Sequence, residues 1–304
     1  MESRRDITLR SNILDFRFKI LGRIATIGFF DGVHKGHCFL FEQLRREAAA
    51  RGLEPLIITF DSHPRKALES DFVPLLLTSF GERKMLLNAI CNTLILPFAD
   101  IQPLTAQEFM QQLKAQYNVS VLLMGYDHQF GSDRLKRPQD YRKIGEQVGI
   151  EVLTMSEYVE GEWHVSSTEI RQALENGNIV VANELLGRPY TLTGTVVHGK
   201  GVGRTIGFPT ANIEPSDPYK IVPRAGVYMV QVDTPTMDNA PAFLNIDTKG
   251  VIEVHIPSFK GDLYDRQLEI RFVRFLRDEK HFDSLEELRK QIKADIDNIL
   301  RQDA

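Results

Sequence analysis

Short apolar runs alternate with longer amphipathic stretches through the first half of this 304-residue chain. The runs have the length of buried strands, whereas the stretches between them repeat apolar residues at helical spacing. Strands are expected at Ile24–Phe29, Pro55–Phe60, Thr93–Leu96, Val119–Met124 and Glu151–Met155, and helices at Gly36–Arg51, Gly81–Ile90 and Thr105–Tyr117 and between Pro138 and Gly149. Strands that alternate with helices form a parallel sheet covered on both faces. The pattern therefore predicts a doubly wound α/β domain.

Local signals mark the ends of two of these helices. Thr105 is followed three residues later by Glu108, which is the spacing of a capping box. Pro138 stands where a helix would begin, and Gly149 stands just past its end.

The pattern changes near Gly187. Helical spacing gives way to short β-rich runs separated by Gly and Pro, at Thr191–His198, Gly226–Val232, Val251–Ile256 and Leu268–Phe275. Such runs are typical of a compact antiparallel barrel or sandwich. A final helix is expected to open at Ser284, with Glu287 as its capping partner, and to run towards Leu300. We therefore divide the chain into domains of residues 1–186 and 187–304, a size that suits two cores.

Composition excludes several classes of protein. The chain has 37 Lys and Arg against 41 Asp and Glu, and its net charge of −4 argues against binding nucleic acid through a general basic surface. The N-terminus lacks the apolar core of a secretory signal, and no apolar run is long enough to cross a bilayer. Two cysteines favour a reducing compartment. We expect a cytoplasmic protein with small-molecule partners and no membrane contact, and the sequence leaves a homo-oligomer open.

The most informative segment is residues 27–37, Ile-Gly-Phe-Phe-Asp-Gly-Val-His-Lys-Gly-His, which reads as a strand, a turn and a helix start. Backbone N–H groups at a helix start favour an anion, and Gly36 lets a phosphate approach the backbone closely. His34 and His37 would add donors to a triphosphate that is attacked at its α-phosphorus. The alternative is that these histidines are helix caps or packed core residues.

A second cluster of polar residues lies at residues 165–171, Val-Ser-Ser-Thr-Glu-Ile-Arg. Hydroxyl groups at a helix start can simply cap the helix. Arg171 follows Ser167 and Thr168 by one helical turn, so it would share their face and could bind the β- and γ-phosphates of a nucleotide.

Together these segments resemble the FAD synthetase module of the bacterial bifunctional riboflavin kinase/FMN adenylyltransferase family. That module belongs to the nucleotidyltransferase superfamily with the His-x-Gly-His motif. The likeness extends through residues 59–65 and 125–131, so it covers nearly all of residues 22–186. The resemblance implies catalytic roles for His34, His37 and Arg171, and nucleotide binding by Gly28, Phe30, Asp31, Gly36, Asp127, Ser166, Ser167 and Thr168. One departure is the segment 132–138, which lacks the glycine that family members usually carry there.

The second domain contains a glycine-rich segment at residues 198–212, His-Gly-Lys-Gly-Val-Gly-Arg-Thr-Ile-Gly-Phe-Pro-Thr-Ala-Asn. Its glycines allow the backbone to wrap a phosphate, and two side chains add positive charge: the residues concerned are Gly199, Gly201, Gly203, Gly207, Lys200 and Arg204. Thr210 and Asn212 would project to one side of an extended segment and offer neutral oxygens to a Mg²⁺ that binds with ATP. A glycine-rich hairpin without a ligand is the alternative.

This segment resembles the riboflavin kinase domain, in which the Thr and Asn of a Pro-Thr-Ala-Asn motif bind the metal. The matching motif here begins at Pro209, and the likeness runs from residue 187 to about residue 300. The family's Glu-x-His strand places a base for the ribityl hydroxyl at Glu253. The resemblance therefore implies riboflavin, FMN and ATP as substrates of the two domains, with Mg²⁺ as cofactor.

A departure precedes Glu253. Family members have a longer loop after an Asn-Ile-Gly string, whereas Asn245–Gly250 runs almost directly into the expected strand. A short hairpin there could lower kinase turnover if the loop helps to exclude water. Two rivals to a bifunctional enzyme follow from this departure: an FAD synthetase alone, and a flavin- or nucleotide-binding regulatory protein.

Overall fold

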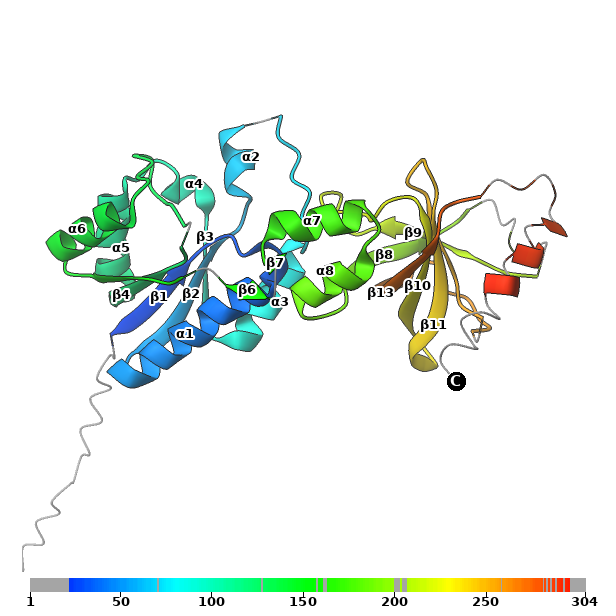
Figure 1. Ribbon diagram of the computed structural model, residues 1–304, viewed down its shortest axis with the longest axis horizontal. Helices are drawn as coiled ribbons and strands as arrows, with labels where there is room; N and C mark the ends of the chain where they lie inside the picture. Colours follow the sequence, from blue (N-terminus) through cyan, green and yellow to red (C-terminus); the bar gives the residue numbers. More distant parts are fainter. Residues whose placement is uncertain are drawn as a thin grey trace, which may run out of the picture.

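Two domains lie along the long axis of the computed structural model, with helices α7 and α8 between them (Figure 1). The structure describes residues 22–295, apart from 70, 127, 157, 161–162, 200–202, 204–206, 258, 281, 283, 285, 288 and 292. Within this part of the chain, no helix is both long and apolar enough to cross a membrane.

The first domain is built on a five-stranded parallel sheet in the order β3-β2-β1-β4-β5. Its strands are β1 (Arg23–Ile27), β2 (Glu54–Phe60), β3 (Thr93–Leu96), β4 (Val119–Met124) and β5 (Glu151–Thr154). The doubly wound α/β prediction is confirmed. Because the strand order reverses between β1 and β4, a crevice is expected at their carboxyl ends.

Helices cover both faces of this sheet. On one face, α1 (Lys35–Arg51) and α3 (Phe80–Ile90) pack against alternate strand residues such as Ile24 and Ile57. On the other face, α5 (Ala106–Tyr117) and α6 (Pro138–Val148) pack against the residues between them, such as Ala25. Both expected helix signals are present, since Thr105 and Glu108 form a capping box and Gly149 ends α6 at φ 74°. Shorter elements in this domain are η1 (Asp31–Val33), α2 (Pro64–Leu68), α4 (Phe98–Ile101), β6 (Val159–Glu160) and β7 (Trp163–His164).

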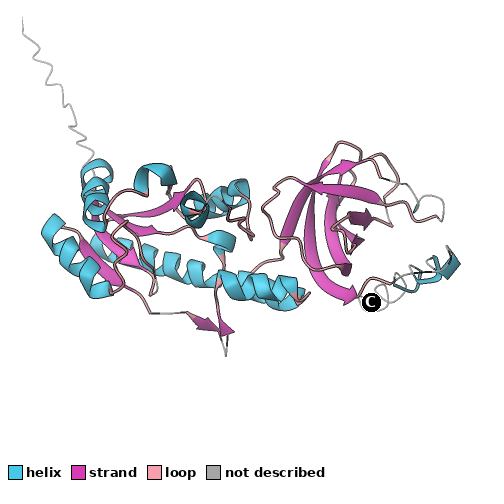
Figure 2. Cartoon of the chain, turned by 90° about the horizontal axis from the view of Figure 1, so that it is seen from above, coloured by secondary structure: helices cyan, strands magenta, loops and turns pink. Residues whose placement is uncertain are grey.

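The second domain is a closed antiparallel barrel with the strand order β10-β11-β12-β9-β8-β13 (Figure 2). Its strands are β8 (Thr191–Val197), β9 (Ala211–Pro215), β10 (Gly226–Thr234), β11 (Met237–Ile246), β12 (Ile252–His255) and β13 (Gln267–Arg277). This confirms the expected barrel and adds β9 and β11. At the expected C-terminal helix, Glu287 N donates to Ser284 Oγ at 3.2 Å. The end of that helix, at Leu300, lies outside the described residues.

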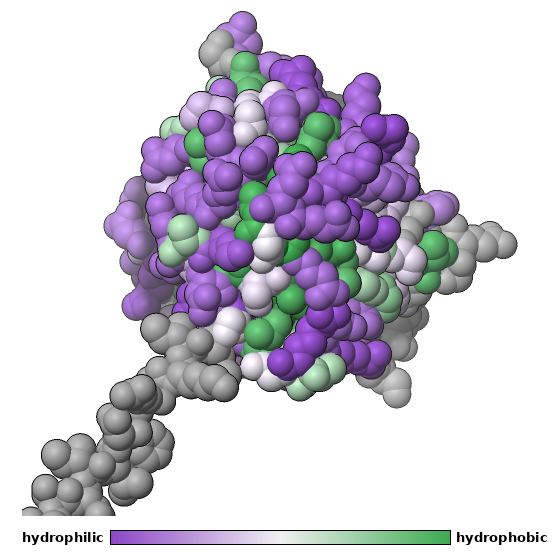
Figure 3. Space-filling model, turned by 90° about the vertical axis from the view of Figure 1, so that its left-hand side faces the viewer, coloured by the Kyte–Doolittle hydropathy of each residue, from purple (hydrophilic) through white to green (hydrophobic). Residues whose placement is uncertain are grey.

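Helices α7 (Ser167–Glu175) and α8 (Ile179–Leu186) share a hydrophobic core with the barrel. Their buried residues include Leu174 and Leu185, which belong to the same cluster as Tyr190 and Phe272 of the barrel. The two domains are therefore joined by packing as well as by the chain. The end of the molecule that lies away from the barrel is formed by the α/β domain. Its surface is mainly hydrophilic, with a narrow central band of hydrophobic residues (Figure 3).

Candidate active sites

A cavity of about 340 Å³ lies at the carboxyl ends of β1, β4 and β5. This is the place where the strand order predicts a ligand site. Most of the residues expected at the nucleotide site line it: Gly28, Phe30, His34, Gly36, His37, Ser166, Ser167 and Thr168. The structure therefore brings the His motif and the hydroxyl cluster together, although about 130 residues separate them in the sequence.

Gly36 permits a close approach of backbone segments at the cavity. A Cβ atom there would lie 3.0 Å from the carbonyl oxygen of Val165 and 3.2 Å from the ring of His34. A larger residue would push apart the two segments that carry the His motif and the hydroxyl cluster.

The two histidines stand at the N-terminus of α1, where backbone N–H groups and the helix dipole favour anions. His34 caps the helix, since its Nδ1 accepts a long hydrogen bond of 3.4 Å from His37 N. The two rings are stacked, with centroids 3.6 Å apart. The capping alternative is thus correct for His34, yet both rings also line the cavity.

Burial keeps both histidines neutral. It lowers the pKa of His34 to about 4, against an opposing effect of Asp31, and it lowers the pKa of His37 well below the usual value, with His34 and Arg188 contributing. They offer N–H dipoles rather than full charges, until a bound polyphosphate raises their pKa values. His37 Nδ1 is buried and has no hydrogen-bond partner among the described residues, so a ligand could supply one.

The three hydroxyl side chains of the cluster have different surroundings. Ser166 Oγ accepts a hydrogen bond from Glu169 N at 3.2 Å, which makes it the helix cap of α7. Ser167 Oγ donates to the carbonyl oxygen of Asp31 at 3.0 Å, so it joins α7 to the turn of the His motif. Thr168 is exposed at the cavity wall and is available to a ligand.

Arg171 and Asp31, both expected at the nucleotide site, form an ion pair with each other. Neither is among the described residues that line the cavity. Arg171 Nη2 forms an ion pair of 2.5 Å with the buried carboxylate of Asp31, and its Nε donates to the carbonyl oxygen of Leu75 at 2.6 Å. Direct contact of Arg171 with phosphates would require this ion pair to open. Asp127 lies outside the described residues.

Residues after β4 and β5 complete the cavity. Tyr126 follows β4, and Met155, Ser156 and Tyr158 follow β5. None of these was proposed from the sequence. The signal was present, because carboxyl ends of neighbouring parallel strands meet at one edge of a sheet.

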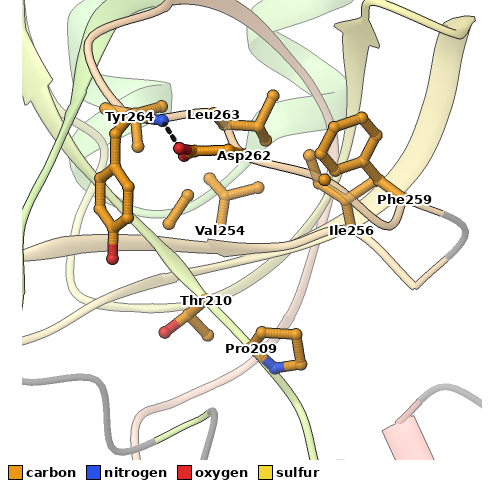
Figure 4. Close-up of a pocket in the computed structure, with 11 residues that line it drawn as sticks. Pro209, Thr210, Val254, Ile256, Phe259, Asp262, Leu263 and Tyr264 are labelled. Carbon is orange, nitrogen blue, oxygen red and sulfur yellow. Dashed lines mark hydrogen bonds between the residues drawn. The ribbon is translucent and has the colours of Figure 1, made fainter.

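A smaller cavity of about 90 Å³ opens on the barrel (Figure 4). Pro209 and Thr210 lie on one side of it, and Asp262 and Tyr264 lie opposite, where the carboxylate of Asp262 accepts a hydrogen bond from Tyr264 N at 2.9 Å. Thr210 is thus placed beside a cavity.

Asn212 and Glu253 are neighbours on the outer face of the barrel. They are register partners in β9 and β12, so their side chains lie on the same face of the sheet. Ile252 and Val254 flank Glu253 and are buried in the barrel core, so Glu253 points outward. The structure therefore brings together two residues that are 41 positions apart in the sequence.

Gly199 and Gly203 of the glycine-rich segment lie against Asn212 and Thr210. A Cβ atom at Gly199 would lie 1.9 Å from Asn212 Nδ2, and one at Gly203 would lie 3.2 Å from Thr210 Oγ1. Both side chains therefore face the loop, as the two-residue spacing predicts. Gly207 adopts a positive φ of 85° in a turn before Pro209. Lys200, Gly201 and Arg204 lie outside the described residues.

The expected short hairpin is present between β11 and β12. The carboxylate of Asp247 accepts hydrogen bonds from Lys249 N and Val251 N at 2.8 Å, and Gly250 adopts a φ of 81°. The departure at this loop is thus a tight, hydrogen-bonded turn that leads directly into the strand of Glu253.

Comparison with known proteins finds matches to both parts of the chain. A family model described as FAD synthetase matches residues 19–169, and one described as riboflavin kinase matches residues 186–302. Proteins named bifunctional riboflavin kinase/FMN adenylyltransferase from Escherichia coli (strain K12) and Pseudomonas fluorescens are each 35% identical, over 90% of this chain and 90% and 91% of their own. A crystal structure described as a macrolide-efflux protein from Streptococcus pneumoniae shares the fold, with a TM-score of 0.81 and 32% identity over 91% of this chain and 93% of that one. With both modules matched and curated relatives aligned along nine-tenths of its length, the chain belongs to the bifunctional riboflavin kinase/FMN adenylyltransferase family.

Proposed function

We propose that the two reactions of this family take place at the two sites described above. The chain phosphorylates riboflavin to FMN with ATP, and then transfers AMP from ATP to FMN, which gives FAD and pyrophosphate. The observation that carries the proposal for adenylyl transfer is the cavity at the N-terminus of α1, where His34, His37 and Thr168 meet. The kinase reaction belongs to the glycine-rich loop and its neighbours, Thr210, Asn212 and Glu253.

Adenylyl transfer needs no nucleophile from the protein. A phosphate oxygen of FMN attacks the α-phosphorus of ATP, and the bond to pyrophosphate breaks. The protein must align two polyanions and stabilise the negative charge that develops between them. The N-terminus of α1 and the N–H groups of His34 and His37 are suited to that task, and Gly28 and Gly36 leave room for phosphates.

Phosphorylation of riboflavin uses a weak base. The ribityl hydroxyl oxygen bonds to the γ-phosphorus of ATP, ADP leaves, and the hydroxyl proton passes to Glu253. In a loose transition state a carboxylate mainly orients the hydroxyl and accepts its proton late. The outward position of Glu253 beside Asn212 supports this role.

Thr210 and Asn212 are the residues that would hold Mg²⁺. Their neutral oxygens suit an ion that keeps several waters and is also bound by ATP phosphates. No cluster of three or more His, Cys, Asp or Glu side chains in the described part of the chain offers a carboxylate-rich alternative. When bound, Mg²⁺ would neutralise charge on the transferred phosphoryl group.

Location and partners complete the proposal. Cys38 and Cys91 are free thiols, which supports a reducing cytoplasm. The small-molecule partners are riboflavin, FMN and ATP. The domain boundary falls between residues 186 and 187, where α8 ends. An FAD synthetase with an impaired kinase is the rival function that the short Asp247–Gly250 turn favours.

Labelled ATP separates the two reactions. With riboflavin, Mg²⁺ and ATP labelled at the γ-phosphorus, we expect label in FMN and in FAD after chromatography. With ATP labelled at the α-phosphorus, we expect label in FAD alone. FAD that forms only from added FMN would support the rival, and a flavin fraction without either label would contradict both activities.

The fit between Gly199 and Asn212 gives a prediction for the kinase. Gly199→Ala should lower FMN formation by about 10-fold or more, because its Cβ would collide with the amide of Asn212 and displace a proposed metal ligand by about 1 Å. FAD formation from supplied FMN should not change. The matched control is Gly81→Ala, at an exposed position of α3 where a Cβ meets no atom within 4 Å. Unchanged FMN formation in Gly199→Ala would remove Asn212 from the site.

Arg171→Lys should impair FAD formation although it keeps the charge. The guanidinium makes two directed contacts, to Asp31 and to the carbonyl of Leu75, and an ammonium cannot reproduce that planar geometry. Lysine would also lack the planar guanidinium geometry if the side chain of Arg171 left Asp31 to bind phosphates. The measurement is the rate of FAD formation at limiting ATP, and a near-normal rate would leave Arg171 without a role in the reaction.

A further inference from the structure

Arg188 connects the second domain to the turn that precedes the His motif. It follows α8, within the segment that matches the riboflavin kinase family. Its Nη2 donates to the carbonyl oxygen of Gly32 at 2.6 Å, and its Nη1 donates to that of Val33 at 3.1 Å and lies 3.4 Å from that of Leu186. A residue beyond the end of the α/β domain thus holds the backbone immediately before His34.

The turn that Arg188 contacts has an unfavourable backbone conformation. Phe30 and Val33 have φ angles of 55° and 42°, in the left-handed region that non-glycine residues seldom adopt. A β-branched residue such as Val33 is especially disfavoured there. A conformation of this kind persists only where surrounding contacts hold it in place.

Contacts within the α/β domain hold the beginning of the turn. The carboxylate of Asp31 accepts hydrogen bonds from Leu77 N and Thr78 N at 3.0 Å, and Gly32 N donates to Thr78 Oγ1 at 3.0 Å. At the end of the turn, Val33 O receives Arg188 Nη1 and a weak contact of 3.7 Å from Cys38 Sγ. The strongest bonds to the carbonyls at the end of the turn therefore come from Arg188.

We propose that Arg188 is a positioning residue for adenylyl transfer, which holds the Gly32–Val33 turn in the conformation that presents His34 and His37 to the cavity. The inference rests on the proposed role of those histidines in FAD formation. Val33 directly precedes His34, which caps α1, so a rotation of its peptide moves the start of the helix. The adenylyltransferase site consequently depends on a residue of the kinase segment.

Charge provides a second signature of this contact. Burial is the main cause of the low pKa of His34, and among the charged groups Asp31 raises this pKa whereas Arg188 and Arg171 lower it. Arg188 also lowers the pKa of His37. Loss of the guanidinium should therefore raise both pKa values, whereas loosening the domain contact elsewhere should not.

The test compares full-length Arg188→Met and Arg188→Lys with the unchanged protein. In Arg188→Met, kcat for FAD formation from FMN should fall about 10- to 100-fold, as expected for misplaced catalytic groups, with a smaller change in KM. NMR titration should show a higher pKa for His34. Arg188→Lys keeps the charge but lacks the planar fork of the guanidinium. The pKa of His34 should therefore return towards its value in the wild-type protein, while kcat stays low. Unchanged FMN formation in the same samples shows that each variant is folded.

Lys66→Met is the matched control for the domain interface. Lys66 Nζ donates to the hydroxyl of Tyr219 and lies 3.7 Å from its ring centroid, so this variant removes a different contact between the domains. We expect normal FAD formation from it. An equal loss in Lys66→Met, a normal kcat in Arg188→Met, or a full recovery in Arg188→Lys would each overturn the positioning role. A wild-type protein that makes no FAD from FMN would instead overturn the proposed function itself.

Discussion

His37→Ala should lower the rate of FAD formation from FMN by about 10²–10³-fold, the usual loss for one preorganised donor to a transition state. His37 lines the cavity at the start of α1, and its buried Nδ1 has no partner among the described residues. FMN formation from riboflavin should remain close to normal, because the kinase residues lie on the barrel. The measurement is the rate of each step, assayed separately with the same protein sample.

His164→Ala is the matched control for this loss. His164 is exposed in β7 and is not among the described residues that line the cavity. We expect it to keep both activities. If His37→Ala remained folded and lost FMN formation as strongly as FAD formation, the assignment of the two reactions to separate sites would be wrong.

Glu253→Gln should lower kcat for FMN formation by about 10²–10⁴-fold, the range associated with loss of a general base. The amide keeps the shape of the side chain, so riboflavin binding should change little. FAD formation from supplied FMN should continue, since adenylyl transfer requires no such carboxylate. Single-turnover formation of FMN at saturating riboflavin measures the step directly.

Glu214→Gln supplies the control carboxylate. Glu214 lies in β9, the strand that pairs with the strand of Glu253, and it is exposed, but its register partner is Thr195 of β8 and not Glu253. It should leave FMN formation unchanged. Equal single-turnover rates for Glu253→Gln and the unchanged protein would remove Glu253 from the mechanism. No FMN from either protein would indicate that the short Asp247–Gly250 turn marks a lost kinase activity.

Periodicity predicted most of the fold. The α/β domain follows from buried runs such as Ile57–Phe60, which are apolar enough to be recognised without a partner strand. Strand β11 was not predicted because it contains Pro241, which weakens a strand signal, and β9 was expected only as an extended segment at Thr210 and Asn212. Pairing across the closed barrel stabilises them, and that long-range contact has no local signature.

The candidate sites were predictable where a motif carries the chemistry. Gly36 allows a close approach to the backbone of Val165, and Asn212 lies against Gly199 of the glycine-rich segment. Both residues belong to motifs that can be recognised in the local sequence. The ion pair of Arg171 with Asp31 was not predictable, because it joins α7 to a turn 140 positions away. Arg188 has no motif at all, and only the packing of the two domains reveals its contact with Gly32.

The central claim is that two separate sites act in sequence through FMN, and mixing two impaired variants tests it most directly. His37→Ala should convert riboflavin to FMN only, and Glu253→Gln should make almost no flavin product from riboflavin. The account predicts that an equimolar mixture of the two forms FAD from riboflavin, ATP and Mg²⁺, after a lag in which FMN accumulates. A mixture that makes no FAD, although Glu253→Gln converts added FMN to FAD, would contradict it.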